Sequence, residues 1–132
     1  MLERGFIDAH VHVWTSDTGR YPLAEGFTPE SMKPPSYTPD ELFADCKPLG
    51  VTRIVLIQMS YYGFDNTYMT DMMRKHRGVF SGVAVIDENK SPRTTMEALA
   101  KQGVRGFRIY PALASGTNWL SGDGMQAMWK YG

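Results

Sequence analysis

This sequence of 132 residues has one cysteine, no formal net charge and no long apolar run. Its one cysteine, Cys46, cannot form an internal disulfide, which favours a reducing compartment over secretion. The 14 basic and 14 acidic residues give zero formal net charge, so neither nucleic acid nor an anionic membrane is expected as a partner. No apolar run reaches the roughly 18 residues of a membrane-spanning helix, and the N-terminus lacks the apolar segment of a signal peptide. We therefore expect a soluble, cytoplasmic protein.

Four short segments rich in Val, Ile, Phe and Tyr have the length and composition of β-strands. The second and third are almost continuously apolar, which is typical of buried parallel strands that are covered by helices. The four segments are residues 5–14, 51–59, 79–86 and 104–110.

Amphipathic segments with helix-start and helix-stop signals lie between these strands. Residues 38–41 (TPDE) combine a capping box with a proline at the first helical position, and Gly50 ends that segment. Methionines recur at helical spacing in the later segments, which indicates a core face. We expect Cys46 in the same core. The later helices are expected over residues 66–78 and 91–103 and from Ser121 or Asp123 onward.

The resulting order, β-α-β-α-β-α-β-(α), predicts an α/β fold with a parallel sheet and right-handed crossovers. Two long loops interrupt the rhythm, residues 15–37 after the first strand and residues 112–122 after the fourth. Both follow the C-terminal ends of strands, where α/β folds place their functional sites.

His10 and His12 are the first candidates for such a site. Residues two apart in a strand share a face, so the two imidazoles are expected to project together, with Asp8 behind them as an orienting partner. Two neutral imidazoles make half of a site for Zn²⁺, Mn²⁺ or Fe²⁺. The alternative is a pair of buried, hydrogen-bonded histidines, which the long loop that follows makes less favoured. His76, near a helix C-terminus, is interpreted as a surface residue.

Candidate substrate-binding residues follow the second and fourth strands. Gln58, Tyr61 and Asn66 are able to hydrogen-bond a substrate; the alternative is a polar loop in which Asn66 caps the next helix. Arg108, near the end of the fourth strand, offers a guanidinium fork for a substrate carboxylate, and the alternative is an internal salt bridge. Arg105 has the opposite parity and is expected to point elsewhere.

The stretches FIDAHVHVW, RIVLIQMSYYGFDNTYM, GVAVID and GVRGFRIY resemble, in order and spacing, amidohydrolase-related family 2, which includes 2-pyrone-4,6-dicarboxylate lactonase and sugar lactonases. The resemblance covers nearly the whole chain and implies a TIM (β/α)₈ barrel with His10 and His12 at the metal or substrate site. Binuclear relatives carry a carboxylated lysine at the fourth strand. Arg108 stands in that region, which implies a mononuclear or metal-free site, and it resembles arginines that hold substrate carboxylates in the lactonase.

A barrel of this kind takes about 250 residues, so residues 1–132 are expected to form the N-terminal half of one amidohydrolase-like domain. The family's later histidine and its last-strand aspartate have no counterpart here. We expect either self-association or binding to the missing half.

The resemblance implies a hydrolase that opens a lactone or cyclic ester of a small carboxylated or sugar-derived substrate by attack of an activated water. Zn²⁺ or Mn²⁺ would be held by His10 and His12, unless the site is metal-independent. Two alternatives stay open: a metal-dependent non-oxidative decarboxylase of the same superfamily, and a catalytically inert fragment that needs the missing half.

Overall fold

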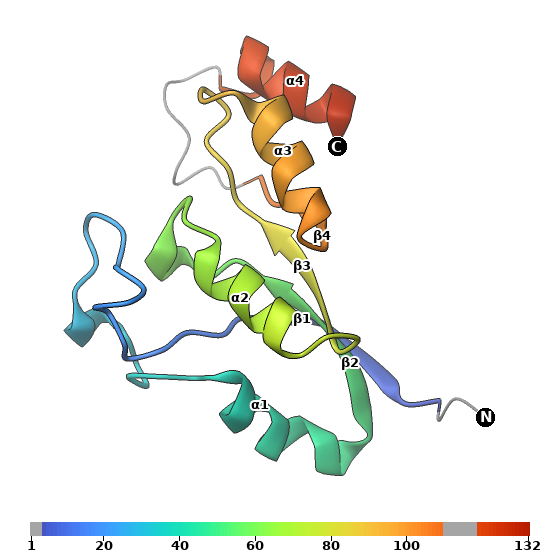
Figure 1. The fold of residues 1–132 in the computed structure, drawn as a ribbon. Coiled ribbons are helices and arrows are strands. Elements are labelled where there is room, and N and C mark those ends of the chain that lie inside the picture. Colours follow the sequence, from blue (N-terminus) through green and yellow to red (C-terminus); the bar gives the residue numbers. More distant parts are fainter. Residues whose placement is uncertain (1–3, 110–118) are drawn as a thin grey trace.

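The computed structural model describes residues 4–109 and 119–132, and Figure 1 shows strands and helices alternating along them as predicted. Tyr110 and most of the predicted loop 112–122 lie outside the described residues. The strands are β1 (Phe6–Val11), β2 (Val51–Ile57), β3 (Phe80–Ala84) and β4 (Val104–Phe107). The α-helices are α1 (Pro39–Cys46), α2 (Thr67–Lys75), α3 (Pro92–Lys101) and α4 (Asp123–Tyr131). Short 3₁₀ helices are η1 (Pro29–Ser31), η2 (Lys47–Leu49), η3 (Ser60–Tyr62) and η5 (Trp119–Ser121).

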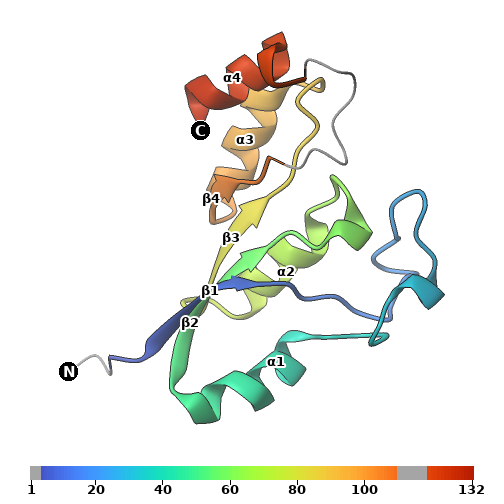
Figure 2. The same cartoon turned by 180° about the vertical axis from the view of Figure 1, so that it is seen from behind.

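The four strands form one parallel sheet in the order β1-β2-β3-β4. Each strand therefore lies beside the next strand in the chain, with a helix in the connection, which is the winding of a (β/α)₈ barrel. Helix α2 lies in front of the sheet in Figure 1 and behind it in Figure 2. Buried side chains of all four α-helices form one core with those of β2, β3 and β4, so the helices cover one face. The other face corresponds to a barrel interior, and we call it the inner face.

Side chains from the strands and the helices form the core between the sheet and its helical layer. Ile54, Leu56, Ala84 and Val104 contribute from the strands, and Cys46 is buried with them as expected. The methionine stripes are confirmed as core. The buried methionines of this cluster are Met69, Met73, Met96, Met125 and Met128.

Helix α1 begins as its sequence predicts. The backbone N–H of Thr38 donates to the Glu41 carboxylate at 2.7 Å, and the Thr38 hydroxyl accepts from the Glu41 N–H at 3.5 Å. Pro39 occupies the first helical position. At the other end Gly50 has φ of +82°, the left-handed conformation that glycine adopts most readily before β2 begins.

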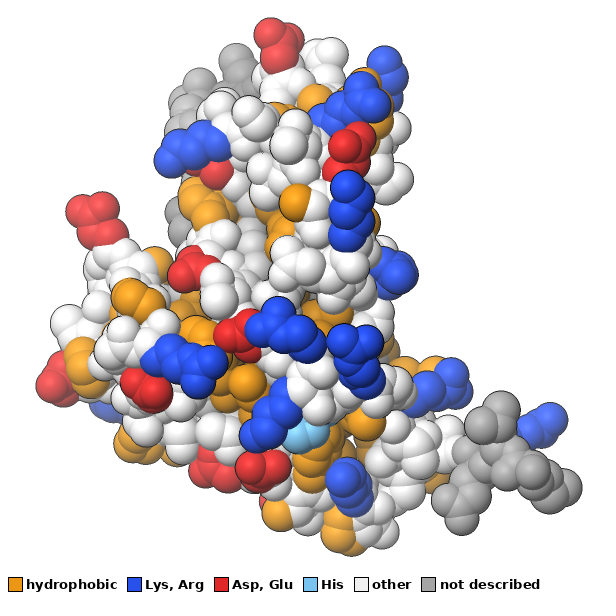
Figure 3. Space-filling model, in the orientation of Figure 1, with side chains coloured by type: hydrophobic (Ala, Val, Ile, Leu, Met, Phe, Trp, Pro, Cys, Tyr) orange, Lys and Arg blue, Asp and Glu red, His pale blue; other side chains and the backbone are white. Residues whose placement is uncertain are grey.

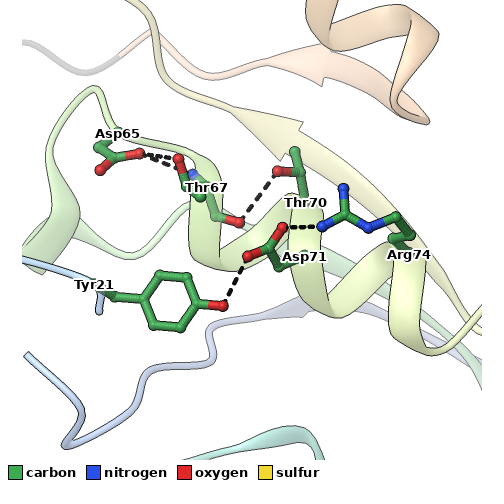
Figure 4. Close-up of polar contacts among 6 residues, drawn as sticks. All are labelled: Tyr21, Asp65, Thr67, Thr70, Asp71 and Arg74. Carbon is green, nitrogen blue, oxygen red and sulfur yellow. Dashed lines mark hydrogen bonds and ion pairs between the residues drawn. The ribbon is translucent and has the colours of Figure 1, made fainter. Parts of the chain in front are cut away.

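The long loop after β1 is attached to α2. The Tyr21 hydroxyl donates to Asp71 Oδ2 at 2.7 Å, and Asp71 also forms an ion pair with Arg74 (Figure 4). Nearer to β1, the Thr15 N–H donates to the Tyr62 hydroxyl at 3.0 Å. The Tyr21 and Tyr68 rings pack edge to face, with 4.8 Å between their centroids. These contacts hold the loop beside the C-terminal end of the sheet.

Basic side chains occupy the last turns of α2, α3 and α4, where they compensate the helix dipoles. In Figure 3 the Lys and Arg side chains gather on the side of the molecule that carries α2 and α3. Among the described residues, no helix has both the length and the hydrophobicity needed to cross a membrane.

The interpretation of His76 as a surface residue is wrong. Its ring packs against Phe43 and Phe80, at centroid distances of 5.1 and 5.7 Å, because the turn after α2 folds back onto α1 and β3. Within the described part of the chain, its Nε2 atom is buried without a hydrogen-bond partner. Burial lowers the pKa of His76, and the nearby lysine charges lower it further.

Helix α4 packs so closely on the loop after β3 that a side chain at Gly124 does not fit. A Cβ atom there would lie 1.8 Å from the carbonyl oxygen of Glu88. Gly124→Ala should therefore lower the free energy of unfolding by about 1–3 kcal/mol, although the same change at an open helical site stabilises by about 0.5–1 kcal/mol. Urea unfolding checks this. The control is Gly19→Ala, where the new Cβ makes only ordinary contact at 3.7 Å; equal stability of the two variants would contradict the close packing of α4.

Candidate active site

The two histidine rings meet at the C-terminal end of β1. His10 Nε2 lies 3.3 Å from His12 Nε2, and the rings are nearly perpendicular, with their centroids 5.0 Å apart. His12 Nδ1 lies 2.9 Å from the carbonyl oxygen of Ile57, at the end of β2. The structure thus brings together the side chains that the two-residue spacing predicts to share a face, and β2 holds one of them in place.

The contact with Ile57 determines which nitrogen of His12 carries the proton. A carbonyl oxygen only accepts hydrogen bonds, so Nδ1 is the donor, and in the neutral ring the lone pair is on Nε2. That lone pair points toward His10. It can accept a hydrogen bond from His10 Nε2 or bind a metal together with it.

The spacing of the pair fits a divalent metal. Two nitrogens bound to one tetrahedral Zn²⁺ at about 2.0–2.1 Å lie roughly 3.3 Å apart, and the observed separation is 3.3 Å. An Nδ1–H donated to a backbone carbonyl is also the usual support of a metal-binding histidine. Among the described residues, however, no group of three or more His, Cys, Asp or Glu side chains is placed to hold a metal. A metal role for the pair therefore stays a prediction.

His12 is electrostatically biased toward its neutral form. Partial burial is the largest cause that lowers its pKa, the charges of His10 and Arg108 lower it further, and the hydrogen bond to Ile57 opposes them. Arg108 follows β4, which ends at Phe107. Its backbone N–H donates to Ala84 O at 2.7 Å, which continues the pairing of β3 and β4 past Phe107.

Arg105 points away from the pair, as expected. Its guanidinium donates to the carbonyl oxygens of Ala100 and Val104 at 2.9 and 2.8 Å. A Cβ on Gly106 would lie 3.3 Å from the Val83 side chain, so Gly106 faces the same side of the sheet as Val83. Glycine keeps that position open on the inner face.

The expected pairing of Asp8 with a histidine ring is wrong, because β1 contains an irregularity. Asp8 pairs with Ile54, and Val11 pairs with Leu56. The chain therefore advances by three residues along β1 where β2 advances by two. The extra residue reverses the alternation, and Asp8 turns to the face of Ile54. Burial raises the pKa of the Cys46 thiol on that side, and the charge of Asp8 raises it further. Asp8 accepts a hydrogen bond from the backbone N–H of His10 at 3.2 Å instead.

The side-chain amides of Gln58 and Asn66 hold the backbone of the loop after β2. Gln58, only 2% exposed, donates to the carbonyl oxygens of Gly63 and Asp65 at 3.1 and 2.8 Å. Asn66 donates to Phe64 O and Val85 O and accepts from the Val85 N–H, at 3.0, 2.8 and 3.1 Å.

These contacts agree with the alternative of a polar loop, because both buried amides support its backbone. A substrate contact by either side chain stays a prediction. The Asn66 side chain does not cap α2; Asp65 Oδ1 accepts from the Thr67 N–H at 3.0 Å in its place (Figure 4).

Tyr61 lies among the aromatic residues that hold the loop after β1. Its ring packs edge to face against Trp14 and Phe27, at centroid distances of 5.8 and 5.4 Å, and its carbonyl oxygen accepts from the Ala24 N–H. Sequence reasoning missed Glu88, which is buried in the loop between β3 and α3. Its signal in the sequence is a second acidic residue, after Asp87, that follows the third apolar segment.

The family model described as amidohydrolase matches residues 7–130 of this chain. The chain belongs to the amidohydrolase family. A relative from Comamonas testosteroni, 2-pyrone-4,6-dicarboxylate hydrolase, is 33% identical over 113 residues, which are 82% of this chain and 34% of the relative. The chain thus spans about a third of the length of that curated relative.

Solved structures confirm the fold expected for this family. A protein from Acinetobacter baumannii, described as a 2-pyrone-4,6-dicarboxylic acid hydrolase with citric acid bound, matches with a TM-score of 0.71 at 20% identity, over 95% of this chain and 44% of that one. A protein of the same description from Pseudomonas putida matches with a TM-score of 0.63 at 23% identity, over 89% and 43%. The amidohydrolase chain therefore has the first four β/α units of a TIM barrel.

The lowered pKa of His12 is directly measurable. In an NMR titration, His12 should titrate below the ordinary value of 6.5, because protonation would charge a partly buried ring next to Arg108. Arg108→Gln should raise the pKa of His12 without restoring the ordinary value, since burial remains. A His12 pKa unaffected by Arg108→Gln would contradict their placement in one site.

Asn66→Ala should destabilise the fold. It leaves the buried N–H and carbonyl of Val85 without their partner, at a cost of about 1–3 kcal/mol for each unsatisfied group. The free energy of unfolding in urea measures the loss. Gln102→Ala, which removes one exposed 3.5 Å hydrogen bond, serves as the control. A loss no larger than in this control would show that the amide bridge contributes little.

Proposed function

We propose that this chain supplies the metal-binding and carboxylate-binding half of a hydrolase site that opens a lactone or cyclic ester of a small carboxylated substrate. The observation that carries the proposal is the pair of Nε2 atoms at 3.3 Å, with His12 held by Ile57 in the tautomer that a metal needs. The relative from Comamonas testosteroni, named for a pyrone dicarboxylate, supports this class of substrate.

His10 and His12 are the residues that would hold Zn²⁺ or Mn²⁺. When bound, such an ion lowers the pKa of a water and polarises the carbonyl that the water attacks. The chain itself would keep the histidine rings neutral and oriented for metal binding. The low pKa of His12 leaves its ring neutral, and the hydrogen bond to Ile57 keeps its Nε2 lone pair directed into the site. The remaining ligand belongs to residues other than the described ones.

Arg108 is the proposed anchor for a substrate carboxylate. It follows β4, and its positive charge is among the causes that lower the pKa of His12, which supports a substrate carboxylate bound near the pair. A guanidinium offers two parallel N–H donors to a carboxylate, and this fork fixes orientation as well as charge. The substrate carbonyl would then face the imidazole pair.

His10→Ala and His12→Ala should each lower lactone hydrolysis by at least about 100-fold in the protein that carries this chain, because each removes a metal ligand. Zn²⁺ binding followed by calorimetry should weaken in parallel. His76→Phe is the matched control, since it removes the third histidine but keeps a ring against Phe43 and Phe80. Full activity in the His10 and His12 variants would refute the site.

Arg108→Lys should raise KM for a carboxylated lactone about tenfold with little change in kcat, because the charge remains and the bidentate fork is lost. An uncharged lactone should show no such change in KM. Release of CO₂ in place of ring opening would show that the site serves a decarboxylase instead.

A further inference from the structure

A cavity of about 420 Å³ opens between α2 and α3, in the helical layer of the sheet. Its wall comes from the second half of α2, the end of α3, the turns after both helices and the start of β3. All of these elements belong to the described residues, and the winding of a barrel continues past β4 rather than between α2 and α3. Further β/α units would therefore not fill this space, which we call the α2–α3 cavity.

The rim of the α2–α3 cavity is basic. Arg74, Arg77 and Lys101 line it, and none of the described residues in its lining is acidic. Asp71, which is not part of the lining, forms an ion pair with Arg74, whereas neither Arg77 nor Lys101 forms an ion pair with a described residue. Figure 3 shows Lys and Arg side chains gathered on this side of the molecule. In a chain with no formal net charge, the cavity thus carries a local excess of positive charge.

Compensation of helix dipoles accounts for only part of this charge. Arg74 and Lys101 lie in the last turns of α2 and α3, where basic residues are favoured. Arg77 lies beyond the end of α2, in the turn that leads to β3, yet it lines the same cavity as Lys101. Charges of like sign repel each other, so cations from two different segments that line one cavity favour an anion between them.

The floor of the cavity is apolar. Met73 belongs to the buried core, and Phe80 is half-buried and stacks on Phe43 with 5.5 Å between the ring centroids. Gly78 has φ of +83°, and a Cβ atom there would meet no described atom within 4 Å, so the wall is open at this turn. A cavity of this volume, with an apolar floor and a few charged groups at its rim, has the character of a small-molecule site.

We propose that the α2–α3 cavity binds a small organic anion with two negative charges on an apolar body, either a dicarboxylate or a phosphate monoester. The apolar body lies on Met73 and Phe80, and the anionic groups pair with Arg77 and Lys101. A guanidinium binds carboxylate and phosphate through parallel N–H donors, and an ammonium adds a point charge. The cavity lies at the start of β3, the opposite end of the parallel strands from the histidine pair. The proposal therefore does not depend on the proposed function.

Isothermal titration calorimetry with isophthalate and with phenyl phosphate tests the proposal in the protein that carries this chain. At low ionic strength at least one of the two should bind, and the comparison shows whether the site takes carboxylates or phosphates. Added salt should weaken the binding, because it screens exposed charges. Inorganic phosphate should bind at least about tenfold more weakly than phenyl phosphate, because it has no apolar body to cover the floor.

Charge-neutralising variants locate the bound anion. Arg77→Gln and Lys101→Gln should each raise the dissociation constant about threefold, and the double variant about tenfold, as expected for exposed charge pairs. Both positions are exposed, so the fold should remain intact, as circular dichroism checks. Lys75→Gln is the matched control, because it removes a charge from the last turn of α2 but lies outside the cavity lining. It should leave the binding unchanged.

Arg108→Gln separates this site from the candidate active site. It should leave unchanged the binding that the Arg77 and Lys101 variants weaken. Binding that is lost with Arg108→Gln and kept in the double variant would place the anion beside the histidine pair and overturn the proposal. Three further results would overturn it: no binding of either organic anion at millimolar concentration, inorganic phosphate that binds as tightly as phenyl phosphate, and equal affinities of Lys75→Gln and the double variant.

Discussion

The hydrogen bond between His12 and the Ile57 carbonyl links the fold to the site. It joins the end of β1 to the end of β2, and it exists because parallel strands end at the same rim of the sheet. The same bond determines the tautomer of His12 and so the direction of its free lone pair. The chemistry of the imidazole pair therefore depends on a contact of 2.9 Å that the parallel pairing of β1 and β2 makes possible.

Most of the fold could be predicted because its signals are local. The capping box of residues 38–41, the glycine at position 50 and the apolar strands each act through neighbouring residues, and the structure confirms them. Period-two alternation was sufficient to bring His10 and His12 together. It failed at Asp8, since an irregularity in strand pairing depends on the partner strand and leaves no local signal.

The hydrogen-bond partners of polar residues could not be predicted from the sequence. Polarity in the loop after β2 correctly marked residues that make hydrogen bonds, and in the structure their partners are backbone groups of that loop and of Val85, just after β3. His76 was misplaced for a similar reason: a helix C-terminus is usually exposed, and only the packing of Phe43 and Phe80 makes this one half-buried. Which group a side chain contacts depends on residues far away in the sequence, so composition and local spacing do not predict it.

The buried amides of Gln58 and Asn66 hold the backbone of the loop after β2. The conformation of this loop therefore depends less on its outward side chains. Substitutions at those outward positions can accumulate without unfolding the rim. The course of this loop is thus separate from the identity of its outward side chains, because buried amides hold the backbone beneath them.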